Sequence, residues 1–434
     1  MNAPSARTVL SVVAISTLAA LASTASDTPS AAPPGEAPAP PVEELVFAAL
    51  ARSPSVAALQ ARLAAAREMV SPAGALPDPM VALTMQDMSF PKWTVGTDPM
   101  SMVGPEFQQD LPFPGKRAAR REAAGAETTV REAEVDQLRR EIAMQVRSLY
   151  GRVYALDRER QFLHAAREML DMLAATSASR YSVGDADQEA VLKAQLEISR
   201  VGERLDDVAA ERSALVAALD RLMDAPAATP LGEVRVLPTA TVAAPPWDEL
   251  AVRTSAAVAA KRAAVAAAEK RVAAARLDLR PDFTTGAAVG LRGGFDPAVT
   301  LRFGLTYPLW RSEKQRPLLA AAEDGLAVAH AELRDAEAGA RSAAATLEAE
   351  WSRTERQVAR YRQAILPQSS AAVDAARAAY LVGRGDFLTV IDDFDRWLDA
   401  RVKLARREAD RFATWAEVEA LFASPVAAQA QREE

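Results

Sequence analysis

The sequence predicts a mainly α-helical fold with a small β part, and three observations support this. Alanine dominates a chain that is 50% hydrophobic but only 6% aromatic, a composition typical of long packed helices. No proline occurs between Pro114 and Pro226, which leaves room for two helices of unusual length. Short segments elsewhere alternate apolar and polar residues, as strands do. We therefore expect long antiparallel coiled-coil helices that carry two β-hairpins.

The two halves of the chain share three landmarks in the same order. The matched segments are Leu76-Pro77-Asp78-Pro79 with Arg280-Pro281-Asp282-Phe283, Leu111-Pro112-Phe113 with Tyr307-Pro308-Leu309, and Tyr181-Ser182-Val183-Gly184 with Tyr380-Leu381-Val382-Gly383. Recurrence in one order predicts an internal duplication. Each half should then contain a helix, a hairpin, a very long helix, a tight turn and a returning helix.

These landmarks divide the chain into predicted units. Arg7, the apolar run after it and the small residues that follow are typical of a signal peptide that directs export, and the proline-rich segment after it is typical of a flexible tether. The units are a signal peptide at 1–25, a tether at 26–41, repeat 1 at 42–230 with a hairpin at about 80–113 and a turn at 181–187, a connector at 231–246, repeat 2 at 247–422 with a hairpin at about 283–309 and a turn at 380–386, and a tail at 423–434.

The helices carry apolar residues every seven positions. In the helix expected from Lys116 to Tyr181 these residues are Val135, Ile142, Leu149, Leu156, Leu163 and Leu170, a spacing that keeps one row of side chains on a partner helix. The returning helix has two such rows, Val191, Ile198, Leu205 and Leu219, and Val201, Val208, Leu215 and Leu222. Two rows predict neighbours on both sides, as in a closed cylinder of helices. Pro367 should kink or divide the long helix of repeat 2.

The predicted strands distinguish a membrane protein from a soluble coiled coil. Residues 298–309 place Val299, Leu301, Phe303 and Leu305 on one face and Thr300, Arg302 and Gly304 on the other, which suits a strand between lipid and water. Four strands cannot close a barrel, and an open edge is not tolerated in lipid. Several chains must therefore contribute four strands each: two chains give eight strands filled by side chains, and three give twelve with the beginning of a lumen.

Composition also excludes several classes of function. The formal net charge is −7 with both signs interspersed, so nucleic-acid binding is not expected. The absence of cysteine excludes disulfides, thiolate metal sites and N-terminal lipidation, and two histidines cannot supply a multi-histidine metal site. No constellation of nucleophile, base and oxyanion donors appears. We expect no enzymatic chemistry and no cofactor.

Over residues 42–422 the pattern resembles the outer membrane factor family, the TolC-like exit ducts of efflux and secretion systems. The resemblance rests on the Leu-Pro-Asp-Pro segment before the first strand, on the two Tyr-x-x-Gly-x-x-Asp turns, and on Pro367 thirteen residues before the second turn. Asp110-Leu111-Pro112-Phe113-Pro114-Gly115-Lys116 is similar to the form found in the heavy-metal efflux branch. A lipidated N-terminal cysteine, which many relatives carry, is missing here.

The resemblance implies a homotrimer with a twelve-stranded barrel in the outer-membrane lipid and a helical barrel in the periplasm. Such a trimer would serve as the passive exit duct of a tripartite efflux system for metal cations or drugs. Its partners would be a periplasmic adaptor protein and an inner-membrane pump, commonly of the resistance-nodulation-division type. Two alternatives remain: an exit duct for secreted polypeptides, and a soluble periplasmic coiled-coil scaffold.

The resemblance also assigns residues to the two turns. They would lie at the tunnel mouth and contact adaptor hairpins, with Val183 and Val382 as contacts and Asp187 and Asp386 as helix caps or docking groups. The residues of the two turns are Tyr181, Val183, Gly184 and Asp187, and Tyr380, Val382, Gly383 and Asp386. A purely structural turn is the alternative, because glycine commonly ends helices and aspartate commonly begins them.

Two further groups are weaker candidates. Asp392 matches a family position in an acidic ring at the periplasmic constriction, with Asp393 beside it, although a second acidic position is Thr389 here; the alternative is a solvated helix face. The first hairpin contains Met80, Met85, Met88, Met100 and Met102. Thioethers bind monovalent copper, but such methionines are more often adaptable apolar contacts.

Overall fold

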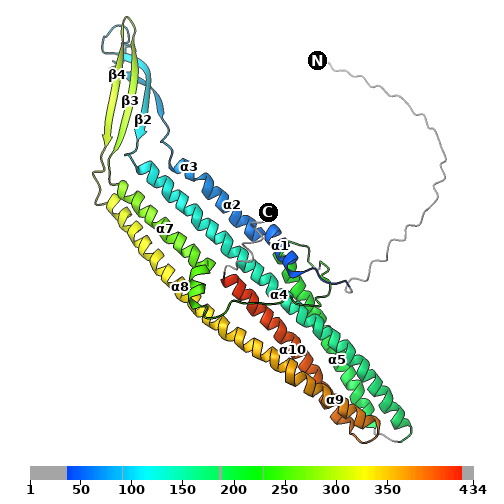
Figure 1. Ribbon diagram of the computed structural model, residues 1–434. Helices are drawn as coiled ribbons and strands as arrows, with labels where there is room; N and C mark the ends of the chain where they lie inside the picture. Colours follow the sequence, from blue (N-terminus) through cyan, green and yellow to red (C-terminus); the bar gives the residue numbers. More distant parts are fainter. Residues whose placement is uncertain (1–36, 90, 185–187, 228, 423–434) are drawn as a thin grey trace, which may run out of the picture.

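The computed structural model describes residues 37–89, 91–184, 188–227 and 229–422 and shows an elongated molecule, with a sheet at one end and long helices running away from it (Figure 1). The signal peptide, most of the tether, the tail and Asp187 lie outside the described residues.

Both repeats run from short helices through a hairpin and a long helical segment to a turn and a returning helix, which confirms the mainly helical fold and fits the duplication. Repeat 1 comprises α1 (Val42–Arg52), α2 (Pro54–Glu68), α3 (Val70–Ala73), β1 (Met80–Gln86), β2 (Met102–Leu111), α4 (Lys116–Ser182) and α5 (Gln188–Leu222). Repeat 2 comprises α6 (Asp248–Thr254), α7 (Ala256–Leu277), β3 (Asp282–Arg292), β4 (Phe295–Thr306), α8 (Gln315–Arg360), the π-helix η1 (Tyr361–Ile365), α9 (Leu366–Leu381) and α10 (Phe387–Leu421).

Helix α4 is one unbroken helix of 67 residues, about 100 Å long at 1.5 Å per residue. Its predicted apolar row is the buried seam: all six positions are buried except Leu149, which is half-buried. The absence of proline therefore predicted the length of this helix, and the seven-residue spacing predicted the face that it buries.

The long helices form a single layer in which α4 and α8 continue along most of the length (Figure 1). Near the sheet, α2 packs on α4 while α7 lies between α4 and α8; farther away, α5 packs on α4 while α10 lies between α4 and α8. The hydrophobic core follows these contacts from Val42 in α1 to Tyr380 and Phe387 near the turn between α9 and α10.

Pro367 divides the long helix of repeat 2, as predicted. It lies in the first turn of α9, directly after the π-helix η1. Proline lacks the N–H that would continue the helical ladder, and the wider π turn takes up the irregularity while the chain remains helical.

The sheet is antiparallel with strand order β1-β2-β3-β4, so the two hairpins lie side by side. Strands β2, β3 and β4 have 10, 11 and 12 residues, enough to cross a bilayer at a tilt, whereas β1 has only 7. β1 is shorter than the expected 9 to 11 residues because Pro79 precedes it and Asp87, with φ at 52°, ends it.

A buried ion pair joins the sheet to the helices where the two repeats meet. The Lys116 ammonium, which is almost fully buried, donates to Asp282 Oδ1 and to the Arg280 carbonyl oxygen, each at 2.8 Å. The backbone N–H of Phe113 donates to the same Asp282 oxygen at 2.8 Å. Two sequence landmarks, Asp110–Lys116 and Arg280–Phe283, thus form one joint.

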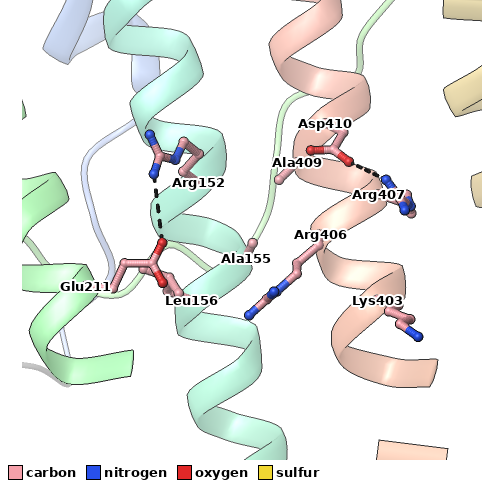
Figure 2. A pocket seen from close by; sticks show the side chains of 9 residues that line it. All are labelled: Arg152, Ala155, Leu156, Glu211, Lys403, Arg406, Arg407, Ala409 and Asp410. Carbon is pink, nitrogen blue, oxygen red and sulfur yellow. Dashed lines mark hydrogen bonds and ion pairs between the residues drawn. The ribbon is translucent and has the colours of Figure 1, made fainter. Parts of the chain in front are cut away.

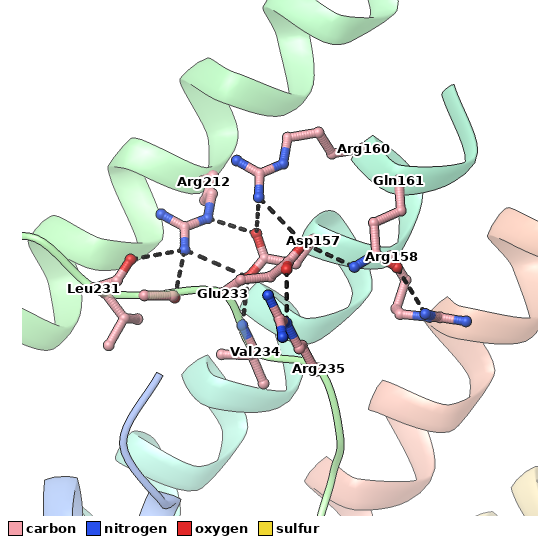
Figure 3. Close-up of polar contacts among 10 residues, drawn as sticks. Asp157, Arg158, Arg160, Gln161, Arg212, Leu231, Glu233, Val234 and Arg235 are labelled. Carbon is pink, nitrogen blue, oxygen red and sulfur yellow. Dashed lines mark hydrogen bonds and ion pairs between the residues drawn. The ribbon is translucent and has the colours of Figure 1, made fainter. Parts of the chain in front are cut away.

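The connector, residues 231–246, crosses the face of α4 and is held there by Asp157 (Figure 3). The Asp157 carboxylate, 0% exposed, accepts hydrogen bonds from Arg212 Nε at 2.7 Å and from the Val234 N–H at 2.9 Å. Arg212 also donates to the carbonyl oxygens of Leu231 and Gly232. The connector is therefore an ordered strap and not a loose linker.

The end of the predicted tether is also ordered. Pro38 forms a parallel bridge with Glu233 of the connector, and the Ala39 N–H donates to the Glu233 carbonyl oxygen at 2.9 Å. The Tyr150 hydroxyl donates to the Pro40 carbonyl oxygen at 3.3 Å. Backbone pairing with the connector thus moves the boundary of any flexible tether to before residue 37.

Candidate functional site

The sheet is the first candidate surface, because the sequence predicted that its strands lie between lipid and water. One face of the sheet exposes a continuous set of large apolar side chains, with Phe303 80% exposed. The members of this apolar face are Val81, Leu83, Met85, Phe107, Val289, Leu291, Val299, Leu301, Phe303 and Leu305. An exposed patch of this extent marks a surface that water does not normally cover.

The other face of the sheet carries a polar bracket. The Arg302 guanidinium on β4 reaches across β3 to the buried carboxylate of Glu106 on β2, and Thr84 on β1 donates its hydroxyl to Glu106 Oε2 at 2.5 Å. This reach is possible because β3 presents only Gly286 and Ala288 opposite Arg302 and Glu106. The bracket links the two edge strands on the face opposite the apolar one.

The first-hairpin methionines do not share one face. Met80 and Met85 are an odd number of residues apart on β1, so their side chains point to opposite faces. Met85 pairs with Val103, whereas Met102 packs against Gly290 on the polar side. Met88 and Met100 lie in the loop beyond the strands. This arrangement favours separate apolar contacts over a common thioether site.

The two turns expose their valines at the end of the molecule farthest from the sheet (Figure 1). Val183 is 77% exposed and Val382 69%. Gly184 and Gly383 have φ of +78° and +73°, a left-handed conformation that costs other residues roughly 1 to 2 kcal/mol. Glycine is thus required by the backbone at both positions, and the apolar side chain before each glycine faces outward.

The two tyrosines of these turns differ strongly in exposure. Tyr181 is 49% exposed, whereas Tyr380 is 3% exposed. The Tyr380 hydroxyl is hydrogen-bonded to Ser177 Oγ of α4 at 2.8 Å, and Arg180 donates to the Tyr380 carbonyl oxygen at 2.9 Å. Tyr380 therefore holds the end of α9 against α4 within the chain and cannot offer an exposed docking surface.

Asp386 occupies the N-cap position of α10, but its side chain makes no capping hydrogen bond. The expected capping role is therefore not seen for Asp386, whose side chain is exposed and open to a docking role.

The predicted gate residues pair with a neighbouring cation. Asp392 is exposed and forms an ion pair with Arg396 at 2.7 Å, and Asp393 pairs with the same guanidinium at 3.3 Å. Arg396, which sequence reasoning missed, lies four residues after Asp392 and so on the same helical face. In the single chain Asp392 is a solvated, paired side chain.

Asp395 lies three residues beyond Asp392 and is an exposed residue of α10. Partial desolvation raises the pKa of its carboxyl, with a further contribution from Glu197 of α5 and an opposing one from Arg200. The sequence could not identify this pKa shift, because the neighbouring acid lies on another helix.

Away from the connector, a groove of about 410 Å³ runs between α5 and α10 over α4 (Figure 2). Its charges are matched: Arg152 pairs with Glu211, Arg407 with Asp410 and Lys403 with Asp399. The buried carboxylate of Glu159 on α4 accepts from both Arg204 of α5, at 3.2 Å, and Arg406 of α10, at 2.8 Å. Such a charge-balanced surface is more typical of a water-exposed surface than of a ligand-binding site.

Among the described residues, no three histidine or acidic side chains gather to hold a metal ion.

Comparison with known proteins agrees with this architecture. Residues 45–225 match the family model of outer membrane efflux proteins. This part of the chain is therefore similar to outer membrane efflux proteins. The match supports the predicted location in the outer membrane with a long periplasmic extension.

Solved structures share the fold over almost the whole chain. The outer membrane protein VceC from Vibrio cholerae is 21% identical with a TM-score of 0.70, covering 88% of this chain and 95% of that one. CusC, described in a study of transmembrane channel formation, is 15% identical with a TM-score of 0.74, covering 88% and 92%. The CmeC outer membrane channel of Campylobacter jejuni is 11% identical with a TM-score of 0.70, covering 90% and 89%. No curated protein sequence matches.

Within the described ranges, no helix is both long enough and apolar enough to cross a membrane.

Proposed function

We propose that this protein is the passive exit duct of a tripartite efflux system and works as a homotrimer. The observation that carries the proposal is the two-faced sheet with two unpaired edge strands, β1 and β4. Lipid would contact the apolar face, and water would contact the face of Thr84, Glu106 and Arg302. Unpaired backbone groups are not tolerated in lipid, so β4 must pair with β1 of a neighbouring chain. Three chains would give twelve strands, enough to leave a lumen.

The helices support the same assembly. Helix α5 packs along α4 and makes no extended contact with any other helix in the described part of the chain. Leu192 and Leu196 are left exposed. In the predicted row of Val191, Ile198, Leu205 and Leu219, the first three residues are only half-buried, and Leu219 alone is buried. On the opposite edge of the layer, Leu318 and Val328 of α8 are exposed. In a trimer these edges would meet and close a helical barrel.

The tips would connect the duct to its partners. Val183, Val382 and the exposed Asp386 form a surface that a periplasmic adaptor could bind, and the adaptor would link the duct to an inner-membrane pump, for which the resistance-nodulation-division type is our expectation. Asp187 belongs to the same proposed surface. The energy for export would come from the pump, because a duct without enzymatic chemistry cannot supply it.

The substrate class is proposed as metal cations or drugs. The heavy-metal form of the Asp110–Lys116 segment supports cations. The match of residues 45–225 to the model of outer membrane efflux proteins argues against the soluble scaffold and favours efflux over polypeptide secretion.

The gate can be tested in planar bilayers. If Asp392 forms an acidic ring in the trimer, three carboxylates in a narrow pore concentrate cations. Asp392→Asn should then lower cation selectivity and the block by multivalent cations, whereas Asp207→Asn on α5, an exposed acid of the other repeat, should change neither. Absence of any channel current in wild-type protein would refute the duct, while an unchanged reversal potential in Asp392→Asn would refute only the gate.

A further inference from the structure

The segment that joins β4 to α8 carries exposed aromatic and basic side chains at the base of the sheet (Figure 1). Residues 307–314 are Tyr-Pro-Leu-Trp-Arg-Ser-Glu-Lys. Leu309 is 75% exposed and Trp310 is 71% exposed, and neither belongs to the hydrophobic core of the described chain. Side chains so large and so exposed mark a surface that something outside the chain covers.

The matched segment of repeat 1 buries its ring and its cation instead. Phe113 is half-buried and stacks against Phe283, with ring centroids 6.4 Å apart. Lys116 is buried in the joint between the two repeats. Tyr307 and Leu309, the matched residues of repeat 2, are exposed. The exposed segment is therefore a particular feature of repeat 2 and does not follow from the duplication.

This segment continues the apolar face of the sheet. Tyr307 and Leu309 keep the alternation of Phe303 and Leu305, so the apolar row of β4 extends to the point where the helices begin. In the proposed trimer β4 would pair with a neighbour through its backbone edge, which leaves its faces uncovered. Lipid that contacts the apolar face would therefore reach Tyr307 and Leu309 as well.

Basic side chains gather at this end of the apolar face. The Arg311 guanidinium lies 4.5 Å from the centroid of the Tyr307 ring, a cation–π contact that keeps it beside the apolar row. Lys314 and Arg316 are exposed, and no carboxylate of the described residues forms an ion pair with any of these three cations. Glu313 is the one acid in residues 307–316. Three positive charges against one negative charge leave a cationic surface where the apolar face ends.

We propose that the base of the sheet binds the headgroups of anionic phospholipids. The binding surface, or basal surface, consists of Tyr307, Leu309, Trp310, Arg311 and Lys314. The indole and phenol rings suit the boundary between hydrocarbon and water, and the guanidinium and ammonium groups bind phosphate. This inference rests on the proposed placement of the sheet in the outer membrane and adds a lipid preference to it.

The test measures which lipid lies beside Trp310. The full-length protein is reconstituted in phosphatidylcholine bilayers that contain a minor fraction of phosphatidylglycerol. Brominated acyl chains, which quench the fluorescence of nearby tryptophans, are carried either by the phosphatidylglycerol or by an equal molar fraction of the phosphatidylcholine. We expect stronger quenching by brominated phosphatidylglycerol in the wild-type protein. Trp310→Phe should abolish this difference, because it removes the tryptophan beside the bound headgroup.

Two further variants test the cations. Lys314→Gln removes a proposed ligand whose side chain makes no hydrogen bond or ion pair with the described residues. It should lower the preference for phosphatidylglycerol about fivefold, the effect of one basic residue near an anionic lipid surface. Arg334→Gln is the matched control, because Arg334 is an exposed cation of α8 without an ion pair among the described residues. It lies about 30 Å farther along the helix at 1.5 Å per residue, and its loss should leave the preference unchanged.

The outcomes separate this inference from the proposed function. Equal quenching by the two brominated lipids, or a difference that persists in Trp310→Phe, would overturn the lipid preference alone. The same holds if Arg334→Gln lowers the preference as much as Lys314→Gln. If Lys314→Gln reduces the mass of the particle but keeps the preference, the basal surface contacts a neighbouring chain and not lipid. Absence of quenching by either lipid would refute the placement of the sheet in a membrane, and with it the proposed function.

Discussion

At the scale of single residues, Asp395 is an exposed residue of α10 whose carboxyl group has a shifted pKa. Partial desolvation together with Glu197 of α5 raises this pKa above the ordinary aspartate value. A raised pKa means that the folded state disfavours the ionised form. Folding is therefore less favourable once the pH exceeds the range in which Asp395 stays protonated.

Replacing this acid should stabilise the protein at neutral pH. A group with a raised folded-state pKa contributes most stability below its unfolded pKa, about 3.9 for aspartate, and loses that contribution as pH rises through the folded value. Asp395→Asn should thus raise the thermal midpoint relative to wild type at pH 7, with a difference that shrinks toward pH 4. Asp399→Asn, an exposed acid paired with Lys403 on the same helix, is the control and should change little. A lower midpoint for Asp395→Asn at pH 7 would contradict the account.

Buried charges are what the sequence could not place at this scale. Asp157, Glu159 and Glu106 are buried, although aspartate and glutamate are usually found on the surface. Each is paired with arginines far away in sequence, such as Arg212 for Asp157 and Arg302 for Glu106. Periodicity identifies apolar faces but contains no information about which distant cation meets a buried acid.

At the scale of elements, the two turns share a motif but differ in packing. The motif Tyr-x-x-Gly predicts the same backbone in both, and both glycines do have positive φ. Yet α9 lies against the end of α4, so Tyr380 is buried against Ser177 and Phe387, while Tyr181 stays half-exposed. Tyr380 therefore acts as a latch, a contact that holds the end of α9 against α4, whereas Tyr181 remains on the surface.

Removing the Tyr380 hydroxyl should weaken this latch between α9 and α4. Tyr380→Phe leaves the ring in place but removes the hydrogen bond with Ser177, which should cost about 1 kcal/mol. Faster amide hydrogen exchange should appear in the first turns of α10 and the last turns of α4, measured by mass spectrometry. Tyr181→Phe, the equivalent residue of repeat 1, should leave exchange unchanged; equal effects of both variants would exclude a latch specific to Tyr380.

Simple sequence rules predicted the main helices and strands more accurately than the local details at their ends. The absence of proline predicted α4 from Lys116 to within one residue of its end at Ser182, and strict alternation predicted most of β4. The short β1, the π turn before Pro367 and the ordered residues 37–41 were not predicted in detail. These features depend on a local φ value, on a helix adjusting to proline, and on pairing with a connector nearly 200 residues away.

At the scale of the whole molecule, one chain is incomplete in two places. The sheet ends in unpaired strands β1 and β4, and the helical layer ends in the partly exposed helices α5 and α8. Both defects lie on the lateral edges, and each would be repaired by the complementary edge of an identical chain. Rotation about one axis closes such head-to-tail contacts into a ring.

The number of chains in the ring is the central claim, and the mass of the particle tests it directly. The full-length protein is purified in detergent, and its protein mass is measured by light scattering with correction for the bound detergent. The account predicts three chains per particle, stable on dilution, because separation would expose the strand edges to the apolar phase. A stable monomer that stays dispersed after the detergent is removed would contradict it.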